Sequence, residues 1–513
     1  MKYAAYIALA FACLFAGFSA RNANIALRAT HADEAEQATT ALNLRDTGKY
    51  EYNPNGPHGP TLYYWADCVK LPPSPRATIG DFRKAMTPIA VLALVALLLT
   101  GRYIGRGAAW AAVACLSMSA VFQIYSGYFV HEIIFAAAIF LTALAAWRFA
   151  CAPTAAAALL VGALAGLSQA TKETSVIAFA AMALSFCVCA AAEKNIRENL
   201  SYILFTRNFF KFAAAFAVGF AAVFAAFYSS FGANWGGLAD AVKSYSHFLA
   251  KSGSDAHASG FAYYLQLLTL QKSEGAVFGE LPIAVLALAG IGFAAARWKK
   301  SAWRCAFATF AFCNGAFAVL ILSLIKYKTP WLLLSPDMFL CAAAGFGAAS
   351  LLSLKNVWAR TAAFAAVAAL AFWQYKLSSN ASERYASDPR NPFIYSHTVR
   401  DFSNLEKRIR EAAKFSEYKN DIPVAFVMRE SPWPAPFDLR DLRNAGFWSG
   451  GKIPENLPIF DVVVCDGSSE DALSAALPPE KYAREFYGLR KNLVLTAFIK
   501  KDIFEKIVNQ DAK

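Results

Sequence analysis

The chain has 513 residues, of which 57% are hydrophobic and only 17% charged, and its mean hydropathy is +0.36. Soluble domains carry about 25% charged residues, so this composition excludes an ordinary soluble protein and indicates that most of the chain lies in a lipid bilayer. The formal net charge of +13 suggests nucleic-acid binding at first sight. The basic residues lie mostly in short gaps between apolar segments, as in loops that face anionic lipid, so the nucleic-acid interpretation is discarded.

Eleven apolar segments, bounded by charged residues, glycine or proline, are predicted to cross the membrane as helices. They lie at residues 3–21, 86–101, 107–124, 131–149, 154–170, 174–192, 210–229, 281–296, 304–325, 331–353 and 357–374. The first also resembles a secretory signal, but it is longer than the usual apolar region of a signal and precedes many further spans, so we interpret it as a span. The short segments at 86–101 and 154–170 leave a re-entrant helix open. The sequence therefore predicts an all-α polytopic membrane domain over residues 1–375.

The basic residues between these segments predict which loops face the cytoplasm. Lysine and arginine gather in alternate gaps, after the second, fourth, sixth, eighth and tenth spans. The positive-inside rule places these gaps, and with them the N-terminus, in the cytoplasm. Residues 22–85, 230–280 and 375–513 are then extracytoplasmic. The predicted location is the cytoplasmic (inner) membrane.

The chain from residue 376 onward regains charge and changes its pattern. Phe402, Leu405, Ile409, Ala412 and Phe415 recur at helical spacing and predict an amphipathic helix at 399–417. Strands are predicted at 422–428, 459–465 and 493–499, and a short helix at 470–476. This alternation predicts a small extracytoplasmic α/β domain over residues 376–513, with a partly parallel sheet.

The segment directly after the first span carries the candidate chemistry. It opens a polar helix that Gly48 can end, and its ionisable or hydroxyl residues are Arg28, Thr30, His31, Asp33, Glu34 and Glu36. One explanation is structural: Thr30 caps the helix, Asp33 takes the place of the capping-box acid, and both acids suit the positive end of the helix dipole. The other is a carboxylate placed for catalysis just above the bilayer.

Several motifs spread over nearly the whole chain carry a family resemblance. They are Arg28 with His31-x-Asp33-Glu34, Gly48-Lys49-Tyr50, His58-Gly59-Pro60, Tyr125-Ser126-Gly127 with Glu132, Lys172-Glu173, and the stretches 326–331, 391–398 and 433–440. Together they resemble the GT-C-type membrane glycosyltransferases. Within that class they are most similar to the prokaryotic flippase-activity-associated group, which is related to protein O-mannosyltransferases and lipid A aminoarabinose transferases.

The resemblance implies transfer of a sugar, a hexose or a pentose, from a polyprenyl-phosphate carrier to a glycan, lipid or protein acceptor. Asp33 matches the base that deprotonates the acceptor hydroxyl, and Glu34 is a second candidate. A carboxylate above the bilayer suits this role if it comes within about 2.6–3.2 Å of the hydroxyl while the lipid tail stays in hydrocarbon. His58, followed by a run of aromatic residues, is a candidate for the sugar site, with an interfacial aromatic belt as the alternative.

Further candidate ligands of the substrate lie at the outer ends of spans. Glu132 and Lys172 lie at depths where ionisable groups are functional candidates by default, although each is within about a turn of a span end, where snorkelling is cheap. Lys326 and Lys328 break the positive-inside pattern, so an anion is expected beside them, either the carrier phosphate or lipid headgroups. The resemblance favours the carrier phosphate, because both lysines lie within a matching motif.

Two questions stay open at this point. Two acids near a phosphate can bind Mg²⁺ or Mn²⁺, so a divalent cation beside Asp33 is a candidate cofactor with an incomplete ligand set. The rival function is a transporter or flippase-associated component that moves lipid-linked glycans without making bonds. A transporter is expected to hold ionisable residues near the midplane on broken, repeated helices. Here they gather at the outer ends, apart from Asp337, about two turns into the tenth span, so the enzyme is favoured.

Overall fold

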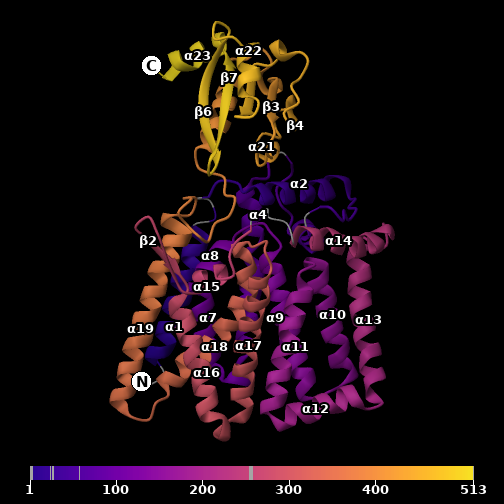
Figure 1. The fold of residues 1–513 in the computed structure, drawn as a ribbon, viewed down its shortest axis with the longest axis vertical. Coiled ribbons are helices and arrows are strands. Elements are labelled where there is room, and N and C mark those ends of the chain that lie inside the picture. The colour runs from indigo at the N-terminus through magenta and orange to yellow at the C-terminus, as the bar shows by residue number, and fades with distance from the viewer. Residues whose placement is uncertain are drawn as a thin grey trace.

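The computed structural model describes residues 4–23, 25, 28–56, 58–74, 76–252 and 258–511. A helical bundle forms one end of the molecule and a small sheet domain forms the other (Figure 1). Between them, α2 (Ala32–Thr47), α4 (Ile79–Ala85) and α14 (Gly236–Ser252) lie over the end of the bundle that faces the sheet domain. The candidate loop after the first span is therefore sandwiched between the two parts.

The bundle is built from long apolar helices. Nine helices in the described part of the chain are long and apolar enough to cross a membrane, which makes this a multi-pass membrane protein. They contain α1 (Ala4–Ala23), α5 (Thr87–Leu99), α9 (Glu132–Cys151), α11 (Ser175–Ala192), α13 (Asn208–Tyr228), α16 (Leu281–Arg297), α17 (Ala302–Leu324), α18 (Leu334–Leu352) and α19 (Val357–Ser379). The apolar helix α10 (Ala155–Thr171) is shorter.

One predicted span is two helices. α7 (Arg106–Met118) ends before Ser119, whose backbone is extended with ψ 134°, and α8 (Ala120–Tyr125) begins directly after it. The Ser119 hydroxyl accepts the Phe122 N–H at 3.2 Å and so caps α8. The prediction of one continuous helix at 107–124 is therefore wrong, because a serine cap breaks the helix without interrupting the apolar run.

Close helix contacts in the bundle depend on small residues. A Cβ added to Gly162 on α10 would lie 2.0 Å from the Phe216 carbonyl oxygen, and one on Gly219 of α13 would lie 2.2 Å from the Leu159 carbonyl oxygen. Only glycine permits these backbones to approach so closely, which is a common way for membrane helices to gain packing contacts.

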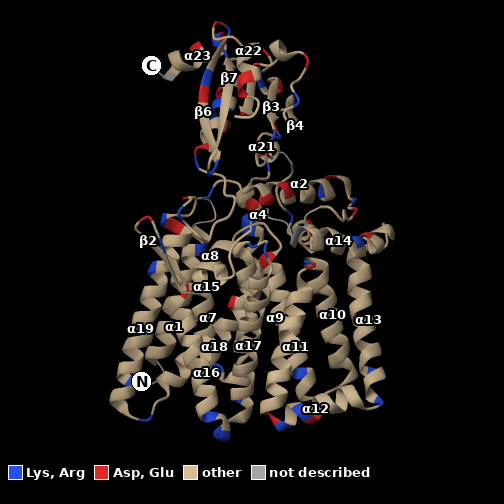
Figure 2. Cartoon of the chain, in the orientation of Figure 1, with Lys and Arg blue, Asp and Glu red and all other residues tan. Residues whose placement is uncertain are grey.

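The end of the bundle far from the sheet domain is rich in basic residues. α12 (Lys194–Phe205) lies across this end, and lysine and arginine dominate its rim (Figure 2). The N-terminus lies at the same end (Figure 1). The basic gaps and the N-terminus thus share one side, as predicted. That this side is cytoplasmic remains a prediction.

The C-terminal sheet has five strands in the order β4-β3-β5-β7-β6. They are β3 (Val424–Met428), β4 (Ala445–Ser449), β5 (Val462–Asp466), β6 (Tyr482–Arg490) and β7 (Leu493–Lys500). β3 runs parallel to both neighbours, whereas β7 is antiparallel to β5 and β6, which confirms a partly parallel sheet. α20 (Phe402–Phe415), α22 (Glu470–Ala476) and α23 (Lys501–Asp511) complete this region. The predicted boundary at residue 376 stays a prediction, since α19 continues to Ser379.

Several short elements connect the longer ones. They are α3 (Thr61–Cys68), α6 (Gly101–Ile104), α15 (Tyr263–Leu268), the hairpin of β1 (Leu270–Ser273) and β2 (Ala276–Gly279), and α21 (Ala435–Asp438). α21 joins the two parts of the molecule, because Thr30 Oγ1 donates to Asp438 Oδ1 at 3.0 Å and Arg440 donates to the Ala77 carbonyl. The sheet domain is therefore bonded to the loop that precedes α2 and to the loop that precedes α4.

Candidate active site

The loop that carries Asp33 begins with a cap that differs from the prediction. His31 is the N-cap of α2: its Nδ1 accepts the Asp33 N–H at 3.1 Å, and Glu34 Oε2 accepts the His31 N–H at 3.3 Å. The capping-box acid is therefore Glu34, and the assignment of Thr30 and Asp33 to the cap is wrong. Thr30 is engaged instead with Asp438 of the sheet domain. This contact between distant segments has no signal in the local sequence.

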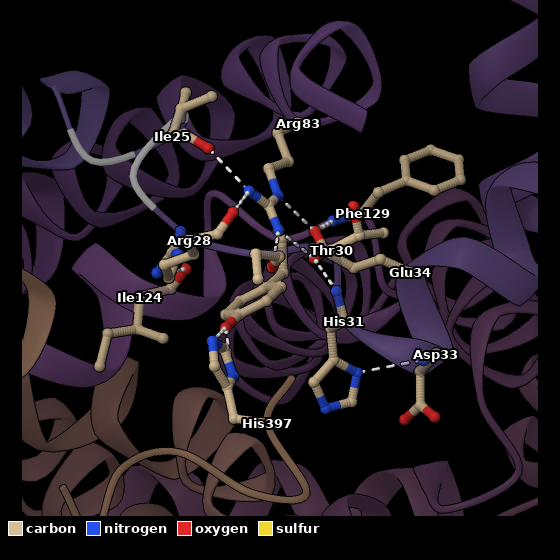
Figure 3. Close-up of polar contacts among 12 residues, drawn as sticks. Ile25, Arg28, Thr30, His31, Asp33, Glu34, Arg83, Ile124, Phe129 and His397 are labelled. Carbon is tan, nitrogen blue, oxygen red and sulfur yellow. Dashed lines mark hydrogen bonds and ion pairs between the residues drawn. The ribbon is translucent and has the colours of Figure 1, made fainter. Parts of the chain in front are cut away.

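Glu34 is buried and fully bonded. Arg83 Nε donates to Oε1 at 2.8 Å and Arg83 Nη2 donates to Oε2 at 2.5 Å, while the Phe129 N–H donates to Oε1 at 2.9 Å (Figure 3). Burial by itself would raise the pKa of Glu34, but the charge and hydrogen bonds of Arg83 outweigh burial, and the pKa is lowered. Arg83 also donates to three carbonyls of the loop that precedes α2. This arrangement favours a structural role for Glu34, and its role as a base stays a prediction.

Asp33 points the other way. In Figure 3 its carboxylate is directed away from the Glu34–Arg83 pair, and only its backbone N–H is bonded to His31. The side chain is partly exposed and accepts no hydrogen bond from any residue that the structure describes. It lines a cavity of about 400 Å³. Of the two acids, Asp33 is thus the one available to a substrate.

The cavity joins a polar end to an apolar wall. Asp33, His58, Lys172 and Glu173 line the polar end. Side chains of α11 and of the end of α17 line the wall, namely Val176, Ile177, Leu322 and Ile325. The cavity therefore combines charged groups at the outer end of the bundle with an apolar surface that continues between two membrane helices.

Lys172 contributes a buried ammonium to the polar end. It follows the last residue of α10 and forms an ion pair with Glu132, the first residue of α9. Only 2% of the Lys172 side chain and 6% of the Glu132 side chain are exposed. An ammonium has three N–H donors, so pairing with one carboxylate oxygen leaves two for a ligand. Lys172 lines the cavity, whereas Glu132 lies behind it and holds it in place.

His58 lies beside Glu173 because the chain turns tightly against α10. A Cβ on Gly59 would lie 2.1 Å from the Ala170 carbonyl oxygen, so only glycine fits after His58. His58 Nδ1 lies 3.0 Å from Glu173 Oε2, and the imidazole stacks on Phe248 with ring centroids 5.4 Å apart. Burial raises the pKa of Glu173. The predicted site residue His58 is thus held between a carboxyl group and an aromatic face.

Lys326 and Lys328 are not among the cavity residues. Their neighbours Tyr327 and Thr329 line it instead. The segment is extended at this point, so successive side chains point to opposite sides, and the lysines face away from the cavity. The Lys328 ammonium donates to the Ser259 carbonyl at 3.1 Å and to the Ile325 carbonyl. Their assignment to the carrier phosphate remains a prediction, and the structure favours Lys172.

A cluster of rings around His31 was not assigned a role from the sequence. It is formed by His31, Tyr125, Tyr128, Trp331, Tyr395 and His397. Because Nδ1 of His31 accepts the Asp33 N–H, its Nε2 carries the proton and donates to the Tyr395 carbonyl at 2.9 Å. Burial, with the nearby charges of Arg28 and Arg83, holds the pKa of His397 well below its usual range. Trp331, Tyr395 and His397 lie in the stretches 326–331 and 391–398, which carry the family resemblance. The sequence therefore contained a signal that these three residues belong to the site.

A metal site at Asp33 has little support. Within the ranges that the structure describes, no group of three or more His, Cys, Asp or Glu residues is placed to hold a metal ion. Glu34 is paired with Arg83 and Glu173 with His58, which leaves Asp33 as the one acid facing the cavity without a bonded partner in the described chain. A Mg²⁺ or Mn²⁺ ion at Asp33 stays a prediction, and no chemical step is assigned to one.

The fold resembles solved structures, although no family model and no curated protein matches the sequence. ArnT from Cupriavidus metallidurans bound to undecaprenyl phosphate has a TM-score of 0.59 at 13% identity, over 96% of this chain and 97% of that chain. The Archaeoglobus fulgidus oligosaccharyltransferase complex with Zn and sulfate has a TM-score of 0.53 at 14% identity, over 94% of this chain and 73% of that chain. The chain has their fold.

The same oligosaccharyltransferase tethered to an acceptor peptide gives a TM-score of 0.53 at 11% identity, over 94% of this chain and 74% of that chain. Both neighbours are GT-C glycosyltransferases, so the predicted GT-C-like fold is confirmed, with its polytopic helical part and small C-terminal α/β part. At these identities the likeness establishes the fold, and the function has to be argued from the site.

Proposed function

We propose that this protein is a membrane glycosyltransferase that moves a sugar from a polyprenyl-phosphate carrier to an acceptor at the outer side of the cytoplasmic membrane. The observation that carries the proposal is the divided cavity, with Asp33 and Lys172 at its polar end and an apolar wall between α11 and α17. A lipid-linked sugar has the same division into a polar head and an apolar chain. The bound undecaprenyl phosphate in the ArnT structure supports this choice of donor.

The donor is oriented by the two ends of the cavity. The prenyl chain lies along Val176, Ile177 and Leu322, where it stays in contact with hydrocarbon. The phosphate lies at Lys172, whose two remaining N–H groups donate to its oxygens. Charge-assisted hydrogen bonds of this kind contribute about 1.5–3 kcal/mol each. The sugar, hexose or pentose, then lies between the phosphate and Asp33, next to His58.

Transfer needs one base and one stabilised leaving group. The Asp33 carboxylate takes the proton from the acceptor hydroxyl, whose oxygen forms a bond to the anomeric carbon of the sugar. The bond from that carbon to the carrier phosphate breaks, and its electron pair leaves with polyprenyl phosphate. Lys172 stabilises the negative charge that develops on this phosphate. The acceptor can be a glycan, a lipid or a protein, provided that it presents a nucleophilic hydroxyl.

The test measures release of the carrier. The purified protein in nanodiscs is given synthetic undecaprenyl-phosphate hexoses and pentoses, with cell membranes as the source of acceptor, and free undecaprenyl phosphate is quantified. Asp33→Asn should lower turnover by about 10²–10⁴-fold, because the amide cannot accept the proton. Asp46→Asn is the matched control, since it makes the same change at an exposed position near the other end of α2. Full turnover in Asp33→Asn would refute the proposal. Movement of intact donor across vesicle membranes, without release of undecaprenyl phosphate, would favour the flippase alternative.

A further inference from the structure

A second polar cluster lies inside the bundle and takes no part in the proposed transfer. It gathers around Ser119, at the break between α7 and α8. Glu280 lies directly before α16, Asp337 lies in the first turn of α18, and Gln374 lies on α19. The two carboxylates are completely buried, and 2% of Gln374 is exposed. The cluster therefore connects the break to three membrane helices.

The Glu280 carboxyl group accepts three hydrogen bonds. Its Oε1 accepts the Ser119 hydroxyl at 3.0 Å and the Val121 N–H at 3.1 Å, and its Oε2 accepts Gln374 Nε2 at 2.6 Å. The donors at Oε1 come from the start of α8, where N–H groups have no partner within the helix. These three hydrogen bonds hold the Glu280 carboxyl group against the start of α8 and against α19.

The Asp337 carboxyl group has no comparable hydrogen bonds. Neither of its carboxylate oxygens accepts a hydrogen bond in the structure, and the same is true of Gln374 Oε1. The nearest polar groups to Asp337 are the Ser119 hydroxyl, which is already bonded to Glu280, and the Cys341 thiol. Within the described chain, neither carboxyl group forms a salt bridge with a lysine or arginine. Two buried carboxyl groups and an amide oxygen thus belong to one cluster, in which the Asp337 oxygens and Gln374 Oε1 have no hydrogen-bond partner.

We propose that this cluster is a binding site for a hard metal cation, held by Asp337, Glu280 and Gln374 Oε1. Buried charges persist in proteins when they are paired or coordinate metals, and pairing with a basic side chain is absent here among the described residues. Oxygen-only donor sets select Na⁺, Ca²⁺ or Mg²⁺ over transition metals. Helix breaks at membrane depth are also where membrane proteins place cation ligands.

The site is connected to the proposed catalytic centre through α8. Ser119 caps the start of this helix, and Tyr125 ends it, with its ring in the cluster around His31. The Tyr125 hydroxyl also donates to the Phe393 carbonyl, in the segment that leads to Tyr395 and His397. A bound cation fixes the start of α8 against α16, α18 and α19, and thereby the position of the ring cluster around His31. The cation therefore has a structural role and does not contact the reacting atoms.

The experiment measures ion binding directly and needs no assay of transfer. Purified protein in detergent is dialysed at pH 8 against ²²Na⁺ or ⁴⁵Ca²⁺, with Mg²⁺ as a competitor, and choline chloride maintains the ionic strength. One ion should bind per chain, and the ion retained or competed identifies the cation. Asp337→Asn and Glu280→Gln should each weaken binding at least tenfold, whereas Asp67→Asn, an exposed acid on α3, should not.

A second readout covers the case in which those variants do not fold. In the wild-type protein the bound cation should raise the thermal unfolding midpoint with a saturable concentration dependence, because only the folded state contains the site. Equal effects of choline, Na⁺, Ca²⁺ and Mg²⁺, or stabilisation by low pH with no stoichiometric binding, would show that a proton or ionic strength is responsible, and would overturn the proposal.

Discussion

Replacing Glu34 by glutamine separates the structural acid of the loop from the proposed catalytic one. The change keeps the size of the side chain but removes the charge that faces Arg83, a guanidinium with no solvent exposure. Arg83 would keep its three bonds to loop carbonyls and lose its counter-charge. Breaking a buried ion pair by removal of one partner costs about 3–5 kcal/mol, so Glu34→Gln should be strongly destabilising.

The assay is thermal unfolding in detergent, followed by intrinsic tryptophan fluorescence. Glu34→Gln should lower the unfolding midpoint by several degrees, whereas Asp33→Asn should leave it within about 1 °C, since the Asp33 carboxylate accepts no hydrogen bond from the described chain. Arg83→Met combined with Glu34→Gln should regain part of the loss, because no buried charge is left unpaired. Equal midpoints for Glu34→Gln and the wild type would refute the reasoning, and so would a large destabilisation by Asp33→Asn.

Three further predictions concern the sheet domain, the topology and the buried lysine. Burial and the charge of a neighbouring carboxylate raise the pKa of Glu406 from 4.5 to about 9, so the folded state holds an extra proton between these values. Stability should therefore fall as pH rises through this window, by at most about 1.4 kcal/mol per pH unit, and Glu406→Gln should flatten the decline in thermal unfolding curves. In intact cells without other accessible cysteines, Lys491→Cys, at an exposed position between β6 and β7, should react with an impermeant maleimide and Lys299→Cys should not; the reverse would invert the topology. Lys172→Met should destabilise by about 3–5 kcal/mol, and adding Glu132→Gln should restore stability but not transfer; restored transfer would remove Lys172 from the donor site.

The membrane helices could be predicted because the thickness of the bilayer sets the length of an apolar run. Each predicted span overlaps an observed helix, but the break at Ser119 was missed, since one serine barely changes the hydropathy of its neighbourhood. In the sheet domain the three buried inner strands were predicted. The two edge strands, β4 and β6, were not: β6 carries charged residues that blur the apolar pattern, and β4 is only five residues long and contains a glycine.

The site could be predicted only in part, and the reason is distance along the chain. Asp33 and His58 are local to one loop, and the resemblance identified both. The partner of Glu34 is Arg83, 49 residues away, and that of His58 is Glu173, 115 residues away, so no local pattern reveals either pair. The direction of Lys328 depends on the alternation of an extended segment, which the motif alone does not show.

A cryo-electron microscopy structure with undecaprenyl phosphate bound tests the central claim most directly. The proposed donor site predicts phosphate oxygens about 2.7–2.9 Å from Lys172 Nζ, the distance of charge-assisted hydrogen bonds. It also predicts the prenyl chain between α11 and α17, and the Asp33 carboxylate facing the phosphate across the space for the sugar. A phosphate held by Lys326 and Lys328 outside this cavity, with the prenyl chain away from α11, would contradict the account.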